Sequence, residues 1–444
     1  MKTAANTNRN RIAAIIMVAA IVPASAYCHA ASFSPTLQGA THPARPSGCV
    51  ELPARANVQN AIETAPLGST LCLAPGAYAG PIVVDRAITI WGPPEAVVRS
   101  NGKGHTIDVR ADNARILGLT IEGSGRRYDT MDAGLHVTGN GVRVEGVTVR
   151  DALFGITFER TENAVVRGNY VVGDPNTPMG LRGDGIRLWS SRGAIADGNL
   201  VEDSRDMLAW FSPNSRITNN VVRRSRYATH FMYSSGALVE GNQYVNNTVG
   251  VFVMYSDGIV IAHNLLAGNS SSDGLGVGGK ESDLSLTDNV IVQDTTGLYL
   301  DSCPFHPGRT DTISGNLFAL CDSAMVFLAS GAHNRFFDNT LRDNQFQVRT
   351  ENRGDLMNAE WARNYFDDYQ GYDLDGDGFG DVPYELRSLS GELIGEYPAL
   401  AFFRGTSALG MIDAASNLFP LFQPQPLLVD RRPRMRPAGT GAAG

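Results

Sequence analysis

The segment Asp257-Gly-Ile-Val-Ile-Ala-His-Asn264 shows most clearly the repeat that decides the fold. It is a short apolar strand closed by an asparagine, and Asn214-Ser-Arg-Ile-Thr-Asn-Asn220 and Ser235-Gly-Ala-Leu-Val-Glu-Gly-Asn242 have the same form. The closing residues are Asn169, Asn199, Asn220, Asn242, Asn264, Asn289, Asn316, Asn339 and Asn364, and Val147 holds the place one repeat earlier. A period just above twenty residues is too short for paired helices and suits one coil of a parallel β-helix.

The closing asparagines also predict how the coils are held together. An asparagine tolerates the left-handed conformation at a tight bend, and its amide can hydrogen-bond to the equivalent amide on the next coil. We therefore expect an all-β chain, a right-handed parallel β-helix of about ten coils between Leu119 and Asn364. An N-terminal helix-and-strand cap and an irregular, partly helical C-terminal tail would flank it.

The N-terminus has the pattern of a secretory signal peptide. Lys2, Arg9 and Arg11 precede the apolar run Ile12 to Val22, and small residues follow from Pro23 to Ala26. Cleavage after Ala26 or Ala30 is expected, and the mature protein is exported. No stretch after this leader is long and apolar enough to predict a membrane anchor.

Composition narrows the function classes. The 444 residues include 48 Gly, 18% are charged, and the formal net charge is −8. Because no basic patch is interleaved with aromatic residues, nucleic acid is not an expected partner. Four cysteines would remain after cleavage at Ala30, and an oxidising compartment permits disulfides between them. The sequence-local pairs are Cys49 with Cys72 and Cys303 with Cys321, although four cysteines allow three pairings.

The segment before the clear repeats predicts a cap. Asn57 can cap a helix from Val58 to Ala65, and short strands separated by turn residues follow it. Such a unit would cover the open end of the solenoid. The expected organisation is a signal peptide (1–30), a lead-in and N-terminal cap (31–80), the β-helix (81–365), an acidic calcium-type loop region (366–396), and an apolar docking tail with a basic end (397–444).

A second strand in each coil carries an unusual outer face. Counting back from the closing asparagine, the inward residues are mostly apolar: Ile186, Leu188, Met207, Ala209, Thr229, Phe231, Val251 and Val253. The outward alternates are Arg187, Trp189, Leu208, Trp210, His230, Met232, Phe252 and Met254. Equal offsets on adjacent coils lie about 4.8 Å apart, so two thioethers and one imidazole can converge on a soft ion.

His230, Met232 and Met254 are therefore candidate ligands for a soft metal ion, with Trp189, Trp210 and Phe252 as a candidate interaction face. The alternative is structural. Methionine often fills gaps in a core, and a register slip of one residue would turn the whole stripe inward.

An acidic loop follows the last repeat. The spacing of Asp373, Asp375, Asp377 and Asp381, with Gly378 at the sixth position, resembles an EF-hand-type calcium loop. Tyr384 stands at position 12 of this pattern, where an acidic ligand is usual. A calcium-free, hydrogen-bonded acidic turn is the alternative.

The tail from Tyr397 to Val429 is apolar but too interrupted for a membrane span. An amphipathic helix is expected between Thr406 and Phe419, either capping the solenoid or docking on a membrane partner. The last segment, Arg431 to Arg436, is basic and expected to be flexible.

Catalytic patterns are missing from the sequence. Polysaccharide-processing β-helices need clustered carboxylates, whereas Glu159 and Asp301 belong to distant repeats. No phosphate-binding Gly-x-x-x-x-Gly-Lys-Ser/Thr run is present, so ATP hydrolysis would belong to a partner. A non-enzymatic protein is expected. Aromatic side chains such as Trp189, Trp210 and Tyr233 can stack on sugar rings, which leaves a carbohydrate-binding or polysaccharide-processing protein as the alternative.

Four motifs together resemble the NosD family of nitrous oxide reductase maturation: Trp210-Phe-Ser-Pro-Asn214, Tyr227-Ala-Thr-His-Phe-Met-Tyr-Ser234, Gly250-Val-Phe-Val-Met-Tyr-Ser256 and Asp373-Leu-Asp-Gly-Asp-Gly-Phe-Gly-Asp-Val-Pro-Tyr384. The resemblance covers almost the whole mature chain. It implies a periplasmic component that works with the membrane and ATPase subunits of an ABC transporter, and that contacts the membrane through them. It also implies contact with a copper-chaperone lipoprotein and with apo nitrous oxide reductase. Copper as the metal comes from this resemblance.

Overall fold

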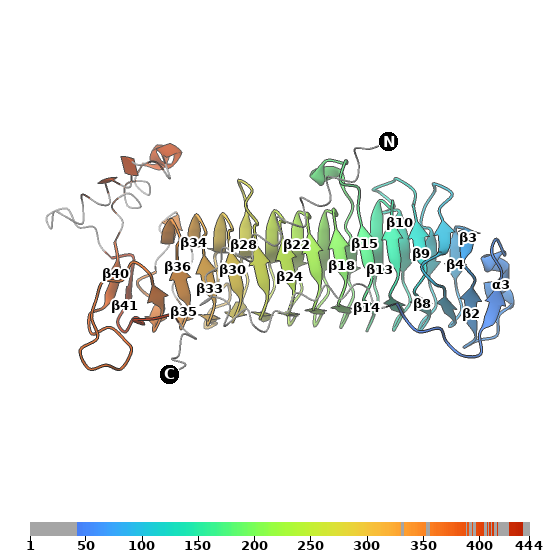
Figure 1. The fold of residues 1–444 in the computed structure, drawn as a ribbon, viewed down its shortest axis with the longest axis horizontal. Coiled ribbons are helices and arrows are strands. Elements are labelled where there is room, and N and C mark those ends of the chain that lie inside the picture. Colours follow the sequence, from blue (N-terminus) through green and yellow to red (C-terminus); the bar gives the residue numbers. More distant parts are fainter. Residues whose placement is uncertain are drawn as a thin grey trace, which may run out of the picture.

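The computed structural model describes residues 42–329, 333–351, 356–387 and 426–437, together with residues 389, 393, 397–403, 406, 408, 409, 411, 412 and 415. The leader (1–30) lies outside these residues, and so does most of the helix expected between Thr406 and Phe419. Figure 1 shows the coils stacked along one long axis, with the helix α3 (Val58–Thr64) at one end and the strands β40 (Tyr384–Leu386) and β41 (Leu428–Asp430) at the other.

Each coil contributes one strand to each of three parallel sheets. Sheet A has 14 strands, from β1 (Val50–Leu52) and β2 (Thr70–Leu73) to β38 (Glu360–Ala362). Sheet B has 13 strands, from β3 (Gly76–Ala79) to β39 (Tyr365–Phe366). The parallel β-helix is confirmed, but it has about 13 coils rather than about ten, and stacking already begins inside the segment 31–80. The early coils lack the closing asparagine, so counting asparagines misses them.

Sheet C, with 12 strands, carries the face on which the candidate site lies. Its strands are β4 (Ile82–Val84), β7 (Ile107–Val109), β10 (Ala133–Val137), β13 (Phe154–Glu159), β16 (Ile186–Trp189), β19 (Asp206–Trp210), β22 (Tyr227–Met232), β25 (Val249–Met254), β28 (Leu275–Lys280), β31 (Thr296–Asp301), β34 (Ser323–Leu328) and β37 (Phe346–Glu351). Phe231, Val251 and Val253 point inward and are fully buried, because alternate side chains of a strand face opposite sides of the sheet.

The closing asparagines form a buried ladder at the corner between sheets A and B. The backbone N–H of Asn242 and its Nδ2 both donate to Oδ1 of Asn264, at 2.9 Å each, and Nδ2 also donates to the carbonyl of Ile217 at 2.8 Å. The same three bonds repeat along the stack. The left-handed conformation falls on the residue before each asparagine, as at Gly241 and His263, and not on the asparagine itself as expected.

The other two corners have polar ladders that the asparagine count does not reveal. Between sheets C and A, serines repeat, and the N–H of Ser234 donates to Oγ of Ser256 at 2.9 Å. Between sheets B and C, Asn247 and Asn269 stack, followed by Asp294, whose Oδ1 accepts the N–H of Asn269. Burial raises the pKa of Asp294 to about 8. Its carboxyl is therefore neutral at neutral pH and can take an amide's place.

These corners explain why the second expected disulfide does not form. Cys303 takes a position in the serine ladder and Cys321 a position in the ladder of Asn247 and Asn269, so the two lie at different corners of the coil. Both are buried thiols, and their Sγ atoms donate to the carbonyls of Asp301 and Ala319. Sequence spacing alone cannot distinguish between corners.

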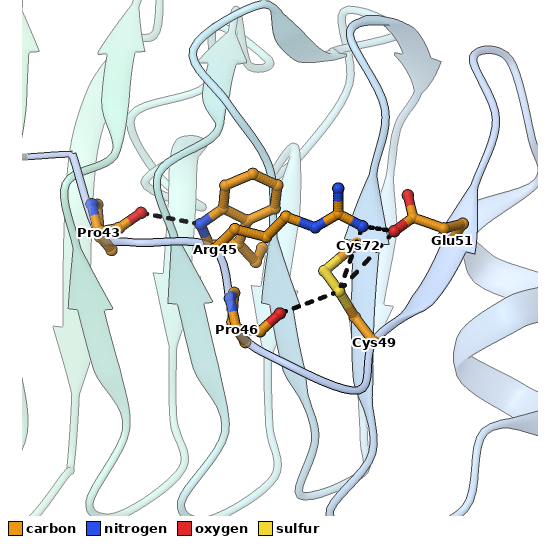
Figure 2. Close-up of a disulfide and its surroundings, with 7 residues drawn as sticks. Pro43, Arg45, Pro46, Cys49, Glu51 and Cys72 are labelled. Carbon is orange, nitrogen blue, oxygen red and sulfur yellow. Dashed lines mark hydrogen bonds and ion pairs between the residues drawn. A yellow bond between two sulfur atoms is a disulfide. The ribbon is translucent and has the colours of Figure 1, made fainter.

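The first expected disulfide is present at the N-terminal cap, where it joins Cys49 to Cys72 (Figure 2). The lead-in chain also contacts the sheets, since Nε1 of Trp91 donates to the carbonyl of Pro43 at 3.0 Å. As expected, Asn57 caps the helix α3, and its Oδ1 accepts the N–H of Asn60 at 3.0 Å.

The C-terminal end is closed by a segment that returns from far along the chain. β41 pairs with β40 in antiparallel fashion, and Leu428 is fully buried in the core. Oδ2 of Asp430 accepts both the N–H and Nδ2 of Asn364 at 2.9 Å, so a carboxylate ends the asparagine ladder. The end of the expected docking tail is therefore a cap. None of the helices in the described residues is long and apolar enough to span a membrane.

Candidate functional site

The outward face of sheet C brings the three candidate copper ligands together on two adjacent strands. The register aligns Met232 of β22 with Met254 of β25, and His230 precedes Met232 by two residues on the same face. All three side chains are half-buried. The inward alternates stay in the core, so the strands have the register that the sequence pattern predicts.

His230 is the centre of this cluster. Its Nε2 lies 3.4 Å from Sδ of Met254, and the rings of Tyr227 and Phe252 flank it with centroids 4.7 and 6.3 Å away. Nδ1 is buried, and within the described part of the chain it has no hydrogen-bond partner. The nearest carboxylate oxygen, Oδ2 of Asp206, is 3.8 Å from Nδ1, too far for a hydrogen bond.

A buried charge network lies beside the imidazole. Arg226 pairs with Asp206, with Nε donating to Oδ1 at 2.9 Å, and Asp184 accepts from Arg187 at 2.6 Å and from Arg205 at 2.9 Å. Burial acts to raise the pKa of Asp206, but the neighbouring His230 and Arg226 outweigh it and lower that pKa below its usual range. Asp206 thus remains a carboxylate next to the imidazole.

Sequence reasoning missed Asp206, although a signal for it existed. The same backward count that finds the outward stripe reaches Asp206 at the start of β19, opposite Tyr227 on the next coil. A charged residue at a position where the next two coils have Tyr227 and Val249 indicates a specific polar contact.

Aromatic rings extend the face on either side of the imidazole. Trp189 and Trp210 lie 4.7 Å apart between centroids, and the guanidinium of Arg187 sits 4.4 Å above the Trp189 ring. At the adjoining corner, Phe211 and Tyr233 stack at 5.2 Å, and about half of each side chain is exposed. Exposed rings in such numbers are typical of an interaction surface.

Two outward carboxylates on this face, Glu159 and Asp301, are too far apart to form the pair that a polysaccharide enzyme needs. Glu159 lies on β13 and Asp301 on β31, at opposite ends of a run of intervening strands in sheet C. Glycosidase carboxylates stand about 5–10 Å apart, so these two cannot act together.

In the acidic loop after the solenoid, backbone N–H groups of the loop donate hydrogen bonds to its aspartates. Asp373 accepts the N–H groups of Gly376 and Gly378 at 2.7 and 2.9 Å, and Oδ2 of Asp381 accepts the N–H of Leu374 at 2.6 Å. Oxygens of Asp373, Asp375 and Asp377 lie within 4.8 Å of one another. Asp381 points to the backbone instead. Calcium binding therefore remains a prediction, next to the alternative of a hydrogen-bonded turn.

A calcium titration separates these alternatives. If Asp373, Asp375 and Asp377 bind calcium, we expect calorimetry to show a site that Asp375→Asn weakens at least about tenfold, because one charged ligand is lost. Chelation should then speed hydrogen exchange from Gly371 to Glu385 and leave the central coils unchanged. Exchange that does not respond to chelation would favour the plain turn.

Comparisons with known proteins find relatives that share one family name. The sequence model of a family described as "Periplasmic copper-binding protein (NosD)" matches residues 171–371, which include His230, Met232 and Met254. A protein of Pseudomonas aeruginosa named as an ABC transporter binding protein NosD is 28% identical over 82% of this chain and 87% of its own length. A protein of Stutzerimonas stutzeri with the same name is 23% identical over 81% of this chain and 85% of its own length.

Solved structures match the fold alone. The A-module of the mannuronan C-5 epimerase AlgE6 from Azotobacter vinelandii has a TM-score of 0.53 at 18% identity, and covers 70% of this chain and 97% of its own. The catalytic unit of a GH87 alpha-1,3-glucanase from Streptomyces thermodiastaticus has a TM-score of 0.58 at 17% identity, and covers 71% and 67%. Both are enzymes, but identity this low transfers only the β-helix.

Proposed function

Because this chain belongs to the NosD family of periplasmic proteins, we propose that it handles copper for the maturation of nitrous oxide reductase, as a component of an ABC transporter system. Its relatives are named as transporter binding proteins, which fits a non-catalytic role. The observation that carries the copper assignment is the contact between Nε2 of His230 and Sδ of Met254 at 3.4 Å.

The donor set fits a copper ion in its reduced state. Two ligands at a near-tetrahedral angle, with a nitrogen about 2.0 Å and a sulfur about 2.3 Å from the ion, lie about 3.5 Å apart. The separation of Nε2 and Sδ is close to this distance. Thioethers are soft ligands that suit Cu(I), and an imidazole accepts either oxidation state. Met232, which lies on the same strand as His230 and is aligned with Met254, offers a second thioether.

The surroundings of the cluster fit transfer of cargo. In this proposal copper is cargo. The protein receives it from a copper-chaperone lipoprotein and passes it to the apo-reductase. The three ligands are half-buried on an outer face, so an incoming ion can reach them without opening the core. The aromatic rings of Trp189, Trp210 and Phe252 border the site and would contact the protein that delivers or accepts the ion.

Membrane contact would come through the transporter's subunits. The solenoid ends in a cap formed by residues 427–436, which leaves the segment before β41 as the part of the tail that can dock. ATP hydrolysis is assigned to a partner subunit in this proposal.

Titration of the mature protein with Cu(I) under a competing chelator tests the proposal. We expect one soft site, and we expect His230→Ala and Met254→Ala each to weaken it at least about tenfold, since loss of even an indirect partner at a metal site costs about 10- to 100-fold. Met232→Ala should also weaken it. Zn(II) should compete poorly, because thioethers are poor ligands for that ion.

The matched control is Met357→Ala, which removes a methionine that is about half exposed and follows β37, four strands beyond β25 in sheet C. It should leave Cu(I) affinity unchanged. Undiminished affinity in the double variant Met232→Ala, Met254→Ala would remove the basis of the assignment.

A further inference from the structure

A loop inserted after β31 brings a histidine to the corner between sheets C and A. On two successive coils, the ladder serines Ser256 and Ser282 are each followed by an aspartate, Asp257 and Asp283. On the next coil Cys303 takes the ladder position, and the inserted loop Pro-Phe-His-Pro-Gly308 follows it. The insertion therefore places His306 over two stacked carboxylates.

The three side chains meet at one point. Nδ1 of His306 lies 3.0 Å from Oδ2 of Asp283 and 3.2 Å from Oδ1 of Asp257. The other oxygen of Asp283 accepts the N–H groups of Phe305 and His306 at 2.9 and 3.2 Å, which fixes the loop to the corner. One oxygen of Asp283 is thus occupied by the backbone, and the other is directed at the imidazole.

We propose that Asp257, Asp283 and His306 form a binding site for a divalent transition-metal ion. Ligand atoms about 2.1 Å from an ion, at angles between octahedral and tetrahedral, lie about 3.0–3.4 Å from one another. Both separations from Nδ1 fall in this range. The ion would replace a proton on Nδ1 and would relieve the repulsion between the stacked carboxylates.

A second histidine, His263, also has two carboxylates nearby, but they approach different nitrogens of its ring. Oε1 of Glu240 approaches Nδ1 at 3.6 Å, and Oδ2 of Asp288 approaches Nε2 at 3.7 Å. Its carboxylates lie on opposite edges of the ring, so no single ion can contact all three groups. Among the histidines that the structure describes, His306 is the one in a cluster with two carboxylates whose ligand atoms all lie close together.

The chemistry of the donors selects the kind of ion. One imidazole nitrogen and two carboxylate oxygens suit an ion of borderline hardness such as Zn²⁺ or Cu²⁺, and no sulfur is present to hold Cu(I). The side chains of His306 and Asp257 are nearly half exposed, which leaves coordination positions for water. Arg309 lies 4.0 Å from Asp283 and is mostly exposed, so it can move away.

Calorimetric titration of the untagged mature chain with Zn²⁺ tests the site. We expect stoichiometric binding that His306→Ala and Asp257→Asn each weaken at least about tenfold. His263→Ala should leave the affinity unchanged, and so should Met254→Ala, which separates this site from the proposed copper site. Circular dichroism and metal-free thermal unfolding would show that the variants are folded.

Two results would overturn the proposal. One is the absence of Zn²⁺ binding in the wild-type chain. The other is Zn²⁺ binding that His306→Ala and Asp257→Asn leave unchanged, which would place the bound ion elsewhere and leave the cluster as a contact between the His306 ring and two carboxylates.

Discussion

Replacing Asn264 by alanine is expected to lower the free energy of unfolding by at least about 3 kcal/mol, because several buried groups lose their partners at about 1–3 kcal/mol each. Oδ1 of Asn264 accepts from the N–H and Nδ2 of Asn242, and its own Nδ2 donates to the carbonyl of Val239 and to Oδ1 of Asn289. One side chain therefore connects three coils. Urea unfolding would give the loss, and hydrogen exchange at the amide of Asn242 would locate it.

The matched control removes an asparagine that lies next to the ladder without belonging to it. Asn219 has φ of 56°, and the equivalent position on adjacent coils is Gly198 or Gly241, so Asn219→Gly introduces no strain. Its Nδ2 contacts only Asp197 near the surface. We expect a loss below about 1 kcal/mol. Equal losses in the two variants would mean that the ladder is not what holds the coils.

An aspartate in the ladder should make stability depend on pH. Burial raises the pKa of Asp294 to about 8 in a comparable corner ladder, and Asn264→Asp should show a shift in the same direction. A carboxyl whose folded pKa lies above its unfolded value of about 3.9 stabilises the fold while it is protonated. The variant should therefore be closest to wild type at acid pH, and should lose stability progressively as the pH rises through the raised pKa.

Local repetition explains why so much of the fold can be predicted. The spacing of residues such as Asn242 and Asn264 sets the coil length, and the alternation around Phe231 and Val253 sets which face is buried. Both signals lie within one coil. The early coils around Trp91 and the corner positions of Cys303 and Cys321 could not be predicted in this way, because spacing does not say at which corner a residue stands.

The candidate site follows the same division. His230 and Met254 lie on regular strands, so counting from the asparagines places them side by side. His306 stands in an insertion that breaks the count, and its aspartates follow serines that the asparagine pattern does not mark. The contacts of a loop depend on the path of its backbone, and the repeat length does not predict that path.

The largest structural effect at the ends of the molecule is expected from removing the returning strand β41. Truncation before residue 426 would leave the N–H and Nδ2 of Asn364 without their acceptor Asp430, and would expose the core surface that Leu428 covers. Even Leu428→Ala should cost about 2–5 kcal/mol, the usual range for a buried leucine. An uncovered coil presents both a sheet edge and an apolar core, so the truncated protein should unfold at lower temperature and aggregate.

Because the truncated protein is expected to unfold and aggregate, deleting the whole tail cannot test whether the tail docks on a partner. Leu386 and Leu428 are directly paired across β40 and β41, and the N–H of Leu427 donates to the carbonyl of Leu386 at 2.7 Å. A short glycine-containing turn can therefore replace residues 388–425 and keep the cap. We expect this variant to match wild type in thermal unfolding and Cu(I) binding, and to lose co-purification with the transporter's membrane subunits. If it still co-purifies, docking must use another surface, of which the aromatic face around Trp189 and Trp210 is the first to test. If it unfolds as readily as the full truncation, the replaced segment is itself part of the cap.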